Sequence, residues 1–228
     1  MLDKKENIVQ IIHDLKNPLN SIKVLTDIFI HKMSEGLNEK QTKILKEIQG
    51  QTEFTLMLVE DLLDEERLSQ NSLSLEREIL DLPLMLEEFI ARSKPAADNK
   101  EIKLELQCEN NIKVNVDLKR FERIFINLID NAIKFSHPRN KVEISAKRDN
   151  DIVFIKVKDF GVGMKEEEVP KIFNSFSQVS SHPTENEKGT GLGLSIVYKL
   201  VKLHGGEIFV ETKENIGTVF TIKFPVEV

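Results

Sequence analysis

The sequence predicts a long α-helical hairpin followed by an α+β domain that is built on a mixed β-sheet. Two observations carry this prediction. Apolar residues recur at helical spacing through the first 68 residues, whereas short alternating runs and amphipathic helical runs follow one another beyond residue 73. The polar run 69–72 lies between the two patterns and marks the domain boundary. We therefore expect two domains, residues 1–70 and residues 71–228.

Composition narrows the class of protein. The chain has 228 residues, a net charge of −6 and a pI near 5.5, which argues against a nucleic-acid-binding protein. Its single cysteine, Cys108, excludes an internal disulfide and a cysteine-built metal site. No apolar run reaches the length of a membrane span, and the first residues do not look like a signal peptide. We expect a cytoplasmic chain, or the soluble part of a longer protein.

The first helix is expected over residues 3–32, because apolar residues recur there every seven positions. These residues are Ile8, Leu15, Ile22 and Phe29. His13 falls at the heptad position furthest from this seam, and Asn17 follows one turn later on the same face. Pro18 removes one backbone donor and crowds the carbonyl of Asp14, so the helix is expected to kink or loosen there. A solvent-facing histidine is by itself most often an ordinary surface residue.

A second helix follows a short turn at Gly36. Asn38 can cap this helix, and its apolar positions extend to Leu68. Two long helices joined by a short turn make an antiparallel hairpin, which buries little of its apolar stripe alone. Two such hairpins would close a four-helix bundle, so we expect a homodimer through residues 3–68.

The second domain is expected to alternate strands with helices. Asp81 can cap a helix that carries Pro83 in its first turn. Further helices are expected over residues 118–135 and 191–204. The expected strands are residues 74–80, 102–108, 112–117, 141–148, 152–158, 206–212 and 218–225. This order indicates a mixed sheet with its helices layered on one face.

The first of four motifs in this domain lies on the 118–135 helix. Asn127 and Asn131 are one turn apart, and their amide oxygens suit a hard cation such as Mg²⁺. Lys134 lies on the same side and can meet a phosphate, and Phe135 follows it. Taken alone, exposed asparagines on an amphipathic helix would be the better reading.

The second motif, residues 159–163, comes directly after a strand. The Asp159 carboxylate can accept an exocyclic amine, while Gly161 and Gly163 let the backbone approach a flat ring. The motif contains the DFG tripeptide of protein kinases. That interpretation fails, because no glycine-rich loop, VAIK lysine or HRD segment precedes it.

The third motif is a pair of phenylalanines, Phe173 and Phe176, before a polar stretch over residues 177–190. By itself such a pair is more typical of a core than of a site. Its position between the second motif and the fourth favours a part in the same site.

The fourth motif opens the last helix and comprises Lys188, Gly189, Thr190, Gly191, Leu192 and Gly193. Free N–H groups at a helix start bind phosphate oxygens, and glycines permit a close approach. A dinucleotide-binding fingerprint would need glycine at position 194, where the sequence has leucine, and would have to follow a strand. The motif therefore predicts a phosphate site of another kind.

In this order, the motifs resemble those of the catalytic core of bacterial two-component sensor histidine kinases. HDLKNPL, residues 13–19, resembles the H box of their dimerisation and histidine-phosphotransfer domain, over residues 3–68. Residues 74–228 resemble their catalytic ATP-binding domain, which has the GHKL fold shared with gyrase and MutL. The resemblance covers nearly every residue. It implies an ATP- and Mg²⁺-dependent protein-histidine kinase, either cytoplasmic or the soluble core of a longer, membrane-bound sensor.

The resemblance also implies roles for residues of the first domain. His13 would be the phosphoacceptor that attacks the γ-phosphate of ATP. Asp14 matches an acidic residue that orients the imidazole and takes its proton. Asn17 matches a position that places a water for dephosphorylation of the partner. That partner would be a response regulator, which accepts the phosphoryl group on an aspartate.

In the second domain, the resemblance implies a nucleotide site. Asn131 would hold Mg²⁺ with Asn127 beside it, Lys134 would touch phosphate, and Asp159 would read the adenine amine. Residues 177–190 would be the ATP lid. The remaining nucleotide-binding residues would be Phe135, Gly161, Gly163, Phe173, Phe176, Lys188, Gly189, Thr190, Gly191, Leu192, Gly193 and Thr218.

Two alternatives stay open. One is a gyrase-like ATPase, but such enzymes use a glutamate as base where this chain has Asn127, which cannot act as one. The other is a non-catalytic ATP-sensing scaffold. All motif positions hold chemically competent residues, which argues against the scaffold.

Overall fold

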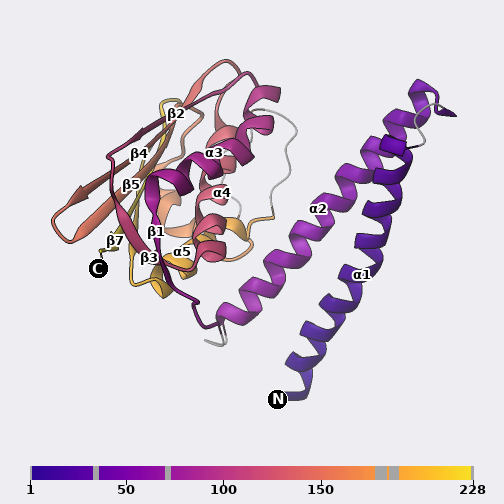
Figure 1. Cartoon of the computed structure of the whole chain (residues 1–228), viewed down its shortest axis with the longest axis horizontal. Coiled ribbons are helices and arrows are strands. Elements are labelled where there is room, and N and C mark those ends of the chain that lie inside the picture. The colour runs from indigo at the N-terminus through magenta and orange to yellow at the C-terminus, as the bar shows by residue number, and fades with distance from the viewer. Residues whose placement is uncertain (1, 33–35, 70–72, 178–183, 185–189, 227–228) are drawn as a thin grey trace. The chain divides into compact units, whose positions relative to one another are not determined.

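The computed structural model describes residues 2–32, 36–69, 73–177, 184 and 190–226, without the side chains of residues 2–11, 13, 32 and 69. The chain divides into two compact units, Met1–Ser72 and Leu73–Val228 (Figure 1). The division falls at the end of the polar run 69–72.

The first unit is a pair of long helices, α1 (Leu2–Lys32) and α2 (Glu39–Ser69). Asn38 caps α2 as expected: its Oδ1 accepts the Gln41 N–H at 2.9 Å, and the Gln41 Oε1 accepts the Asn38 N–H at 2.9 Å. The helix α1 continues through Pro18 as one helix.

Polar links between described side chains join the facing sides of α1 and α2, and three of them define the register. Lys16 pairs with Glu60 at 2.7 Å, Lys23 pairs with Glu53 at 3.2 Å, and Gln49 donates to Asp27 at 2.5 Å. From one link to the next, the residue number on α1 rises by as much as the residue number on α2 falls. The helices therefore form an antiparallel hairpin.

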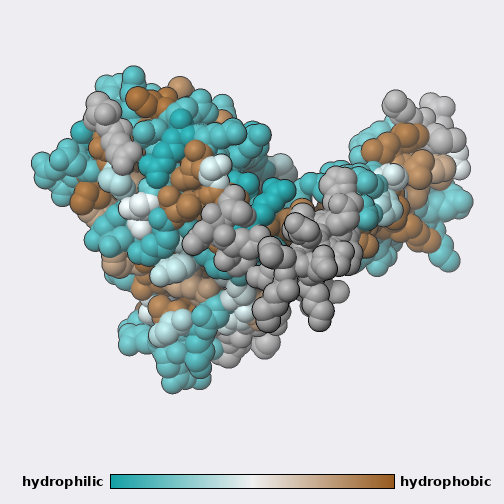
Figure 2. Space-filling model, turned by 90° about the horizontal axis from the view of Figure 1, so that it is seen from below, coloured by the Kyte–Doolittle hydropathy of each residue, from teal (hydrophilic) through white to brown (hydrophobic). Residues whose placement is uncertain are grey.

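Much of the apolar surface of the hairpin is uncovered. Figure 2 shows hydrophobic side chains gathered on it, at the right of the view. The exposed large apolar residues of α1 and α2 are Leu15, Ile22, Val24, Leu25, Ile28, Phe29, Ile44, Ile48, Met57 and Leu62. Three of the four heptad residues are in this group, so one hairpin does not bury the seam that the sequence pattern defines.

The second unit contains a five-stranded mixed sheet, as expected. The strand order is β2 (Lys103–Cys108), β4 (Lys141–Asp149), β5 (Ile152–Asp159), β7 (Gly217–Pro225) and β6 (Glu207–Lys213). The pair β2–β4 is parallel and the other three pairs are antiparallel. One face of the sheet is covered by α3 (Leu82–Asn99), α4 (Leu118–Phe135) and α5 (Gly193–Leu203), as Figure 1 shows.

Two features differ from the expected elements. The strand expected over residues 74–80 begins only at β1 (Glu78–Asp81), which pairs with β3 (Lys113–Val116) in a separate two-stranded sheet. One reason is that the Glu76 N–H donates to the Asp117 carboxylate at 3.0 Å, so this backbone is satisfied without a strand partner. A short 3₁₀ helix, η2 (Glu166–Lys171), was also not expected.

The core lies between the sheet and α4. The inward face of α4 is fully buried and includes Phe121, Phe125, Leu128 and Ile129. On β5, alternate residues are buried beneath the helices, while the intervening ones reach the outer face of the sheet. This packing brings the loop after β5 to the end of α4, and the start of α5 to Asn127 on the same helix.

Candidate functional site

Asp159 is the last residue of β5, and its carboxylate is buried. Its Oδ1 accepts two backbone N–H groups, from Gly161 at 3.0 Å and from Thr218 at 3.1 Å. Burial raises the pKa of Asp159 to about 6, and the hydrogen bonds from Gly161 and Thr218 oppose this increase. Because Oδ1 makes both bonds, Oδ2 is the oxygen that remains for a ligand.

Gly161 joins this motif to the end of α4. A Cβ at Gly161 would lie 2.0 Å from the Phe135 carbonyl oxygen, so no larger residue fits without moving backbone. The same oxygen accepts the Val162 N–H at 3.1 Å, and Ser136 pairs with Gly161 in an isolated bridge. The structure thus brings the motifs that contain Phe135 and Asp159 together.

Thr218 and Gly163 lie on the other side of the same loop. The Thr218 hydroxyl is 3.1 Å from the Thr212 hydroxyl, which accepts the Met164 N–H at 3.0 Å. At Gly163 a Cβ would lie 2.0 Å from the Lys213 carbonyl oxygen. The loop after β5 is therefore held against β6 and β7.

Asn127 reaches from α4 to the start of α5. Its Nδ2 donates to the Arg123 carbonyl at 2.9 Å, and its Oδ1 is 2.7 Å from the position that a Cβ on Gly193 would occupy. Within the described residues, the half-buried Asn131 amide has no hydrogen-bond partner. Two amide oxygens one turn apart on α4, the first of them beside the start of α5, form a donor set that suits a hard cation.

The phenylalanine motif contacts the last glycine motif. Gly191 has a φ of +72°, and a Cβ there would lie 3.1 Å from the Phe176 Cα, so this position favours glycine. The Phe173 ring packs against Tyr198 of α5, with the ring centroids 5.2 Å apart and the rings tilted by 37°. The Thr190 hydroxyl accepts the N–H of Leu192, a buried residue directly before α5, at 3.0 Å.

Further polar groups meet at the C-terminal end of α4. The Lys134 carbonyl accepts the ammonium of the buried Lys100 at 2.7 Å and the Thr184 hydroxyl at 3.3 Å. That hydroxyl also lies 2.7 Å from the Ser136 carbonyl. The Lys134 ammonium is 5.3 Å from the ring centroid of Phe135. Lys100 and Thr184 were not expected from the sequence, because their partners are backbone carbonyls, which leave no sequence pattern.

Some expected site residues cannot be placed. Lys188, Gly189 and most of the expected lid over residues 177–190 lie outside the described residues. His13 is in α1, but its side chain is also outside them. Asp14 and Asn17 are exposed on α1, in the other compact unit.

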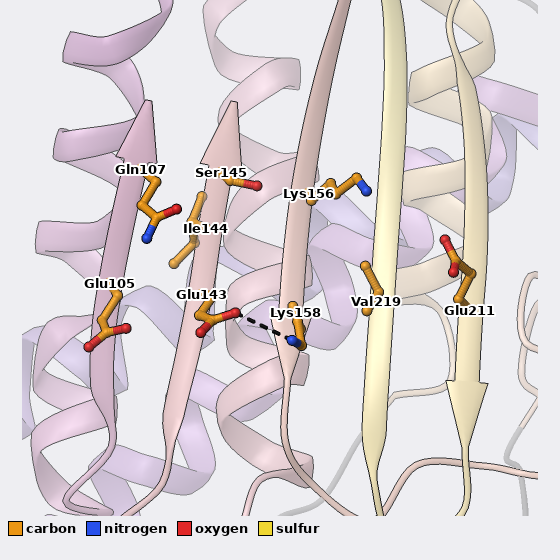
Figure 3. A pocket seen from close by; sticks show the side chains of 9 residues that line it. All are labelled: Glu105, Gln107, Glu143, Ile144, Ser145, Lys156, Lys158, Glu211 and Val219. Carbon is orange, nitrogen blue, oxygen red and sulfur yellow. Dashed lines mark ion pairs between the residues drawn. The ribbon is translucent and has the colours of Figure 1, made fainter. Parts of the chain in front are cut away.

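A pocket of about 330 Å³ lies away from these motifs, on the outer face of the sheet (Figure 3). Its lining comprises Glu105, Gln107, Glu143, Ile144, Ser145, Lys156, Lys158, Glu211 and Val219. Glu143 pairs with Lys158 at 3.5 Å within it. The helices cover the opposite face, so this pocket is a groove between charged side chains of a solvated sheet face.

Two family models match the chain. The His Kinase A (phospho-acceptor) domain matches residues 5–71, and the histidine kinase-, DNA gyrase B- and HSP90-like ATPase matches residues 116–228. The circadian input-output histidine kinase CikA of Synechococcus elongatus is 31% identical over 97% of this chain and 30% of its own length. The chain spans about a third of the length of the curated relatives it matches.

Solved structures agree with these matches. The histidine kinase AdeS of Acinetobacter baumannii has a TM-score of 0.67 at 25% identity, over 92% of this chain and 98% of its own. The catalytic domain of the histidine kinase ThkA has a TM-score of 0.58 at 30% identity, over 66% of this chain and 95% of its own. In the described residues, no helix is long and apolar enough to cross a membrane.

Proposed function

The chain belongs to the two-component sensor histidine kinases, and from this membership we propose that it transfers the γ-phosphoryl group of ATP to its own His13. The observation that carries the proposal is that α4 contacts both the loop that follows Asp159, at Phe135, and the start of α5, at Asn127. This region combines a base-reading carboxylate, amide oxygens and a glycine-rich helix start.

Adenine recognition rests on Asp159. Its Oδ1 is occupied by two backbone donors, so Oδ2 is the atom that would accept the adenine amine. Guanine carries a carbonyl at the corresponding position, and a carboxylate would repel it. The site therefore favours ATP over GTP.

Phosphate binding is assigned to the start of α5 and to Lys134. The N–H groups that follow Gly191 and Leu192 begin a helix, where backbone donors and the helix dipole favour anions. Asn131 and Asn127 offer amide oxygens that fit Mg²⁺, which would neutralise charge on the phosphates when bound. Lys134 would contribute a further positive charge.

In the transfer step, a ring nitrogen of neutral His13 attacks the γ-phosphorus. The new N–P bond forms as the bond from the γ-phosphorus to the bridging oxygen breaks, and ADP leaves with that electron pair. Asp14 accepts the proton that the imidazole loses. Asn127 cannot serve as a general base for water, so transfer to histidine is favoured over hydrolysis.

The proposal extends to two protein partners. A second copy of the chain would cover the exposed apolar stripe of the hairpin and close a four-helix bundle through residues 3–68. A response-regulator aspartate would then take the phosphoryl group from His13. The exposed Asn17 would orient a water that later hydrolyses the aspartyl phosphate.

The test is incubation of the chain with γ-labelled ATP and Mg²⁺. The expected result is label on the protein that is labile in acid and stable in base, as a phosphohistidine is. His13→Gln should lose this label and still bind ATP, because the nucleotide residues lie in the other compact unit. Full acid-labile label on His13→Gln would place the phosphoacceptor elsewhere, and labelled free phosphate without labelled protein would indicate an ATPase.

A further inference from the structure

Asn140 lies in the loop between α4 and β4 and is held on three sides. Its Nδ2 donates to the Phe160 carbonyl at 2.8 Å, and its Oδ1 accepts the Lys141 N–H at 2.9 Å. Its own carbonyl accepts the Lys103 N–H from β2 at 3.0 Å. The side chain is half-buried, and the sequence motifs did not include it.

The carbonyl that Asn140 holds belongs to the peptide between Phe160 and Gly161. The N–H of the same peptide donates to the Asp159 Oδ1 at 3.0 Å. A trans peptide is planar, so its carbonyl and its N–H point in opposite directions and cannot rotate independently. One peptide plane is thus fixed at one end by Asn140 and at the other by the buried carboxylate.

We propose that Asn140 is a positioning residue for nucleotide recognition. By holding the Phe160 carbonyl, it aims the Gly161 N–H at Asp159 and so keeps the second carboxylate oxygen directed at the adenine amine. This inference rests on the proposed ATP-binding function of Asp159.

The next peptide is anchored independently, because the Val162 N–H donates to the Phe135 carbonyl at 3.1 Å. Loss of the Asn140 bond would therefore loosen one peptide and leave the rest of the loop docked on α4. The effect should reach the ligand through Asp159 alone.

A double-mutant cycle separates this role from general support of the loop. ATP binding with Mg²⁺ is measured by calorimetry on the full chain for wild type, Asn140→Ala, Asp159→Asn and the double variant. Asn140→Ala should weaken ATP binding about two- to ten-fold, the effect of one lost hydrogen bond. The same change in the Asp159→Asn background should have little further effect, since the carboxylate that it positions is gone.

The pH dependence of binding gives a second readout. Burial raises the pKa of Asp159, and the Gly161 N–H opposes this, so a loosened peptide raises the pKa further. As the pH is lowered from about 8 to about 5, ATP affinity should therefore begin to fall at a higher pH in Asn140→Ala than in wild type. Other ionisable groups on the surrounding elements include Lys100, Lys134, His137, Lys158 and Lys213. Asp159→Asn serves as the reference, because it lacks the carboxyl group, so any pH dependence of binding that it retains comes from other groups such as the phosphates of ATP.

Two matched variants complete the design. Serine at position 140 is too short to reach the Phe160 carbonyl, so Asn140→Ser should weaken ATP binding as Asn140→Ala does. It replaces the alanine variant if that variant unfolds the loop. Asn110→Ala, in an exposed turn, should bind ATP as wild type does. If Asn140→Ala weakened ATP binding equally in wild type and in Asp159→Asn, or left the pH profile unshifted, the role of Asn140 would be overturned. The proposed role of Asp159 would not be affected. Absence of ATP binding by the wild type would overturn the proposed function and this inference with it.

Discussion

The carboxylate of Asp159, which we propose binds adenine, affects the stability of the free domain as well. Burial raises its pKa to about 6 from an ordinary value of 3.8, so the native state favours its protonated form. A carboxyl whose folded pKa is raised contributes stability that is full below pH 3.8 and is lost as the pH rises through about 6. At neutral pH the ionised group therefore destabilises the free domain, while the proposed adenine contact requires the same ionised form.

Asp159→Asn should separate these two effects. The asparagine Oδ1 can still accept both backbone N–H groups, but Nδ2 would face the adenine amine as a donor. We expect ATP affinity to fall roughly ten- to a hundred-fold, with poor GTP binding in the wild type. The free variant should be more stable than wild type at neutral pH, by on the order of 3 kcal/mol, and this gain should shrink toward pH 4. Calorimetry and thermal melts measure both effects, and unchanged ATP affinity would show that Asp159 does not read the base.

Asp14 and Asn17 should affect opposite halves of the reaction cycle. An amide is a poor base, so Asn17 should act by orienting water, and Asn17→Ala should slow loss of label from the regulator while sparing labelling of His13. Asp14→Asn should cut autophosphorylation, because the imidazole loses its proton acceptor. The two rates are measured for each variant. Equal damage to both rates by both variants would point to a shared structural role near Pro18.

At the scale of elements, His204 joins the end of α5 to the start of α4. Its Nδ1 lies 2.8 Å from the Leu200 carbonyl and its Nε2 accepts the Asp117 N–H at 3.2 Å, so the ring is neutral in this junction. Burial lowers the pKa of His204, more than the Leu200 carbonyl raises it. When the pKa of a histidine is lower in the folded state, the histidine stabilises the fold at pH values above its pKa in the unfolded state. This stability is lost as the pH falls through the pKa of the folded state.

We expect the stability advantage of wild type over His204→Gln to shrink as the pH falls below about 6.5. Glutamine keeps an acceptor oxygen for the Asp117 N–H and does not titrate. Asp159 changes stability in the opposite direction, but it is present in both proteins and cancels in the difference. Thermal melts across the pH series provide the measurement, and a difference that does not vary with pH would contradict the role of His204.

Most elements could be predicted because their signals are local. The helix expected over residues 118–135 coincides with α4, since its cap and its periodicity lie within one stretch of chain. The start of β1 could not be placed, because it depends on the Asp117 carboxylate 41 residues away. Asn140 was missed for the same reason: its partner carbonyl is 20 residues further on and leaves no mark in the sequence.

At the scale of the whole molecule, the two units divide the labour. The residues that we propose bind the nucleotide lie in Leu73–Val228, whereas the exposed apolar stripe lies in Met1–Ser72. Ile22→Asp should dissociate the expected homodimer and leave ATP affinity unchanged, because a charge would then stand in the apolar seam. Light scattering and calorimetry measure the two properties, with Asn20→Asp, an exposed polar position of α1, as the matched control. A dimeric Ile22→Asp would place the interface elsewhere.

The three polar links of the hairpin give it a single axial register. If α1 slid four residues along α2 in one direction, Lys16 would face Leu56 and Asp27 would face Leu45. In the other direction, Lys23 would face Met57 and Asp27 would face a glutamate. Either movement breaks at least two links at once, so the polar pairs favour the observed register over one shifted by a helical turn. Movement of α1 along α2 by one helical turn therefore gives up at least two partly exposed polar links, each of which contributes modest free energy.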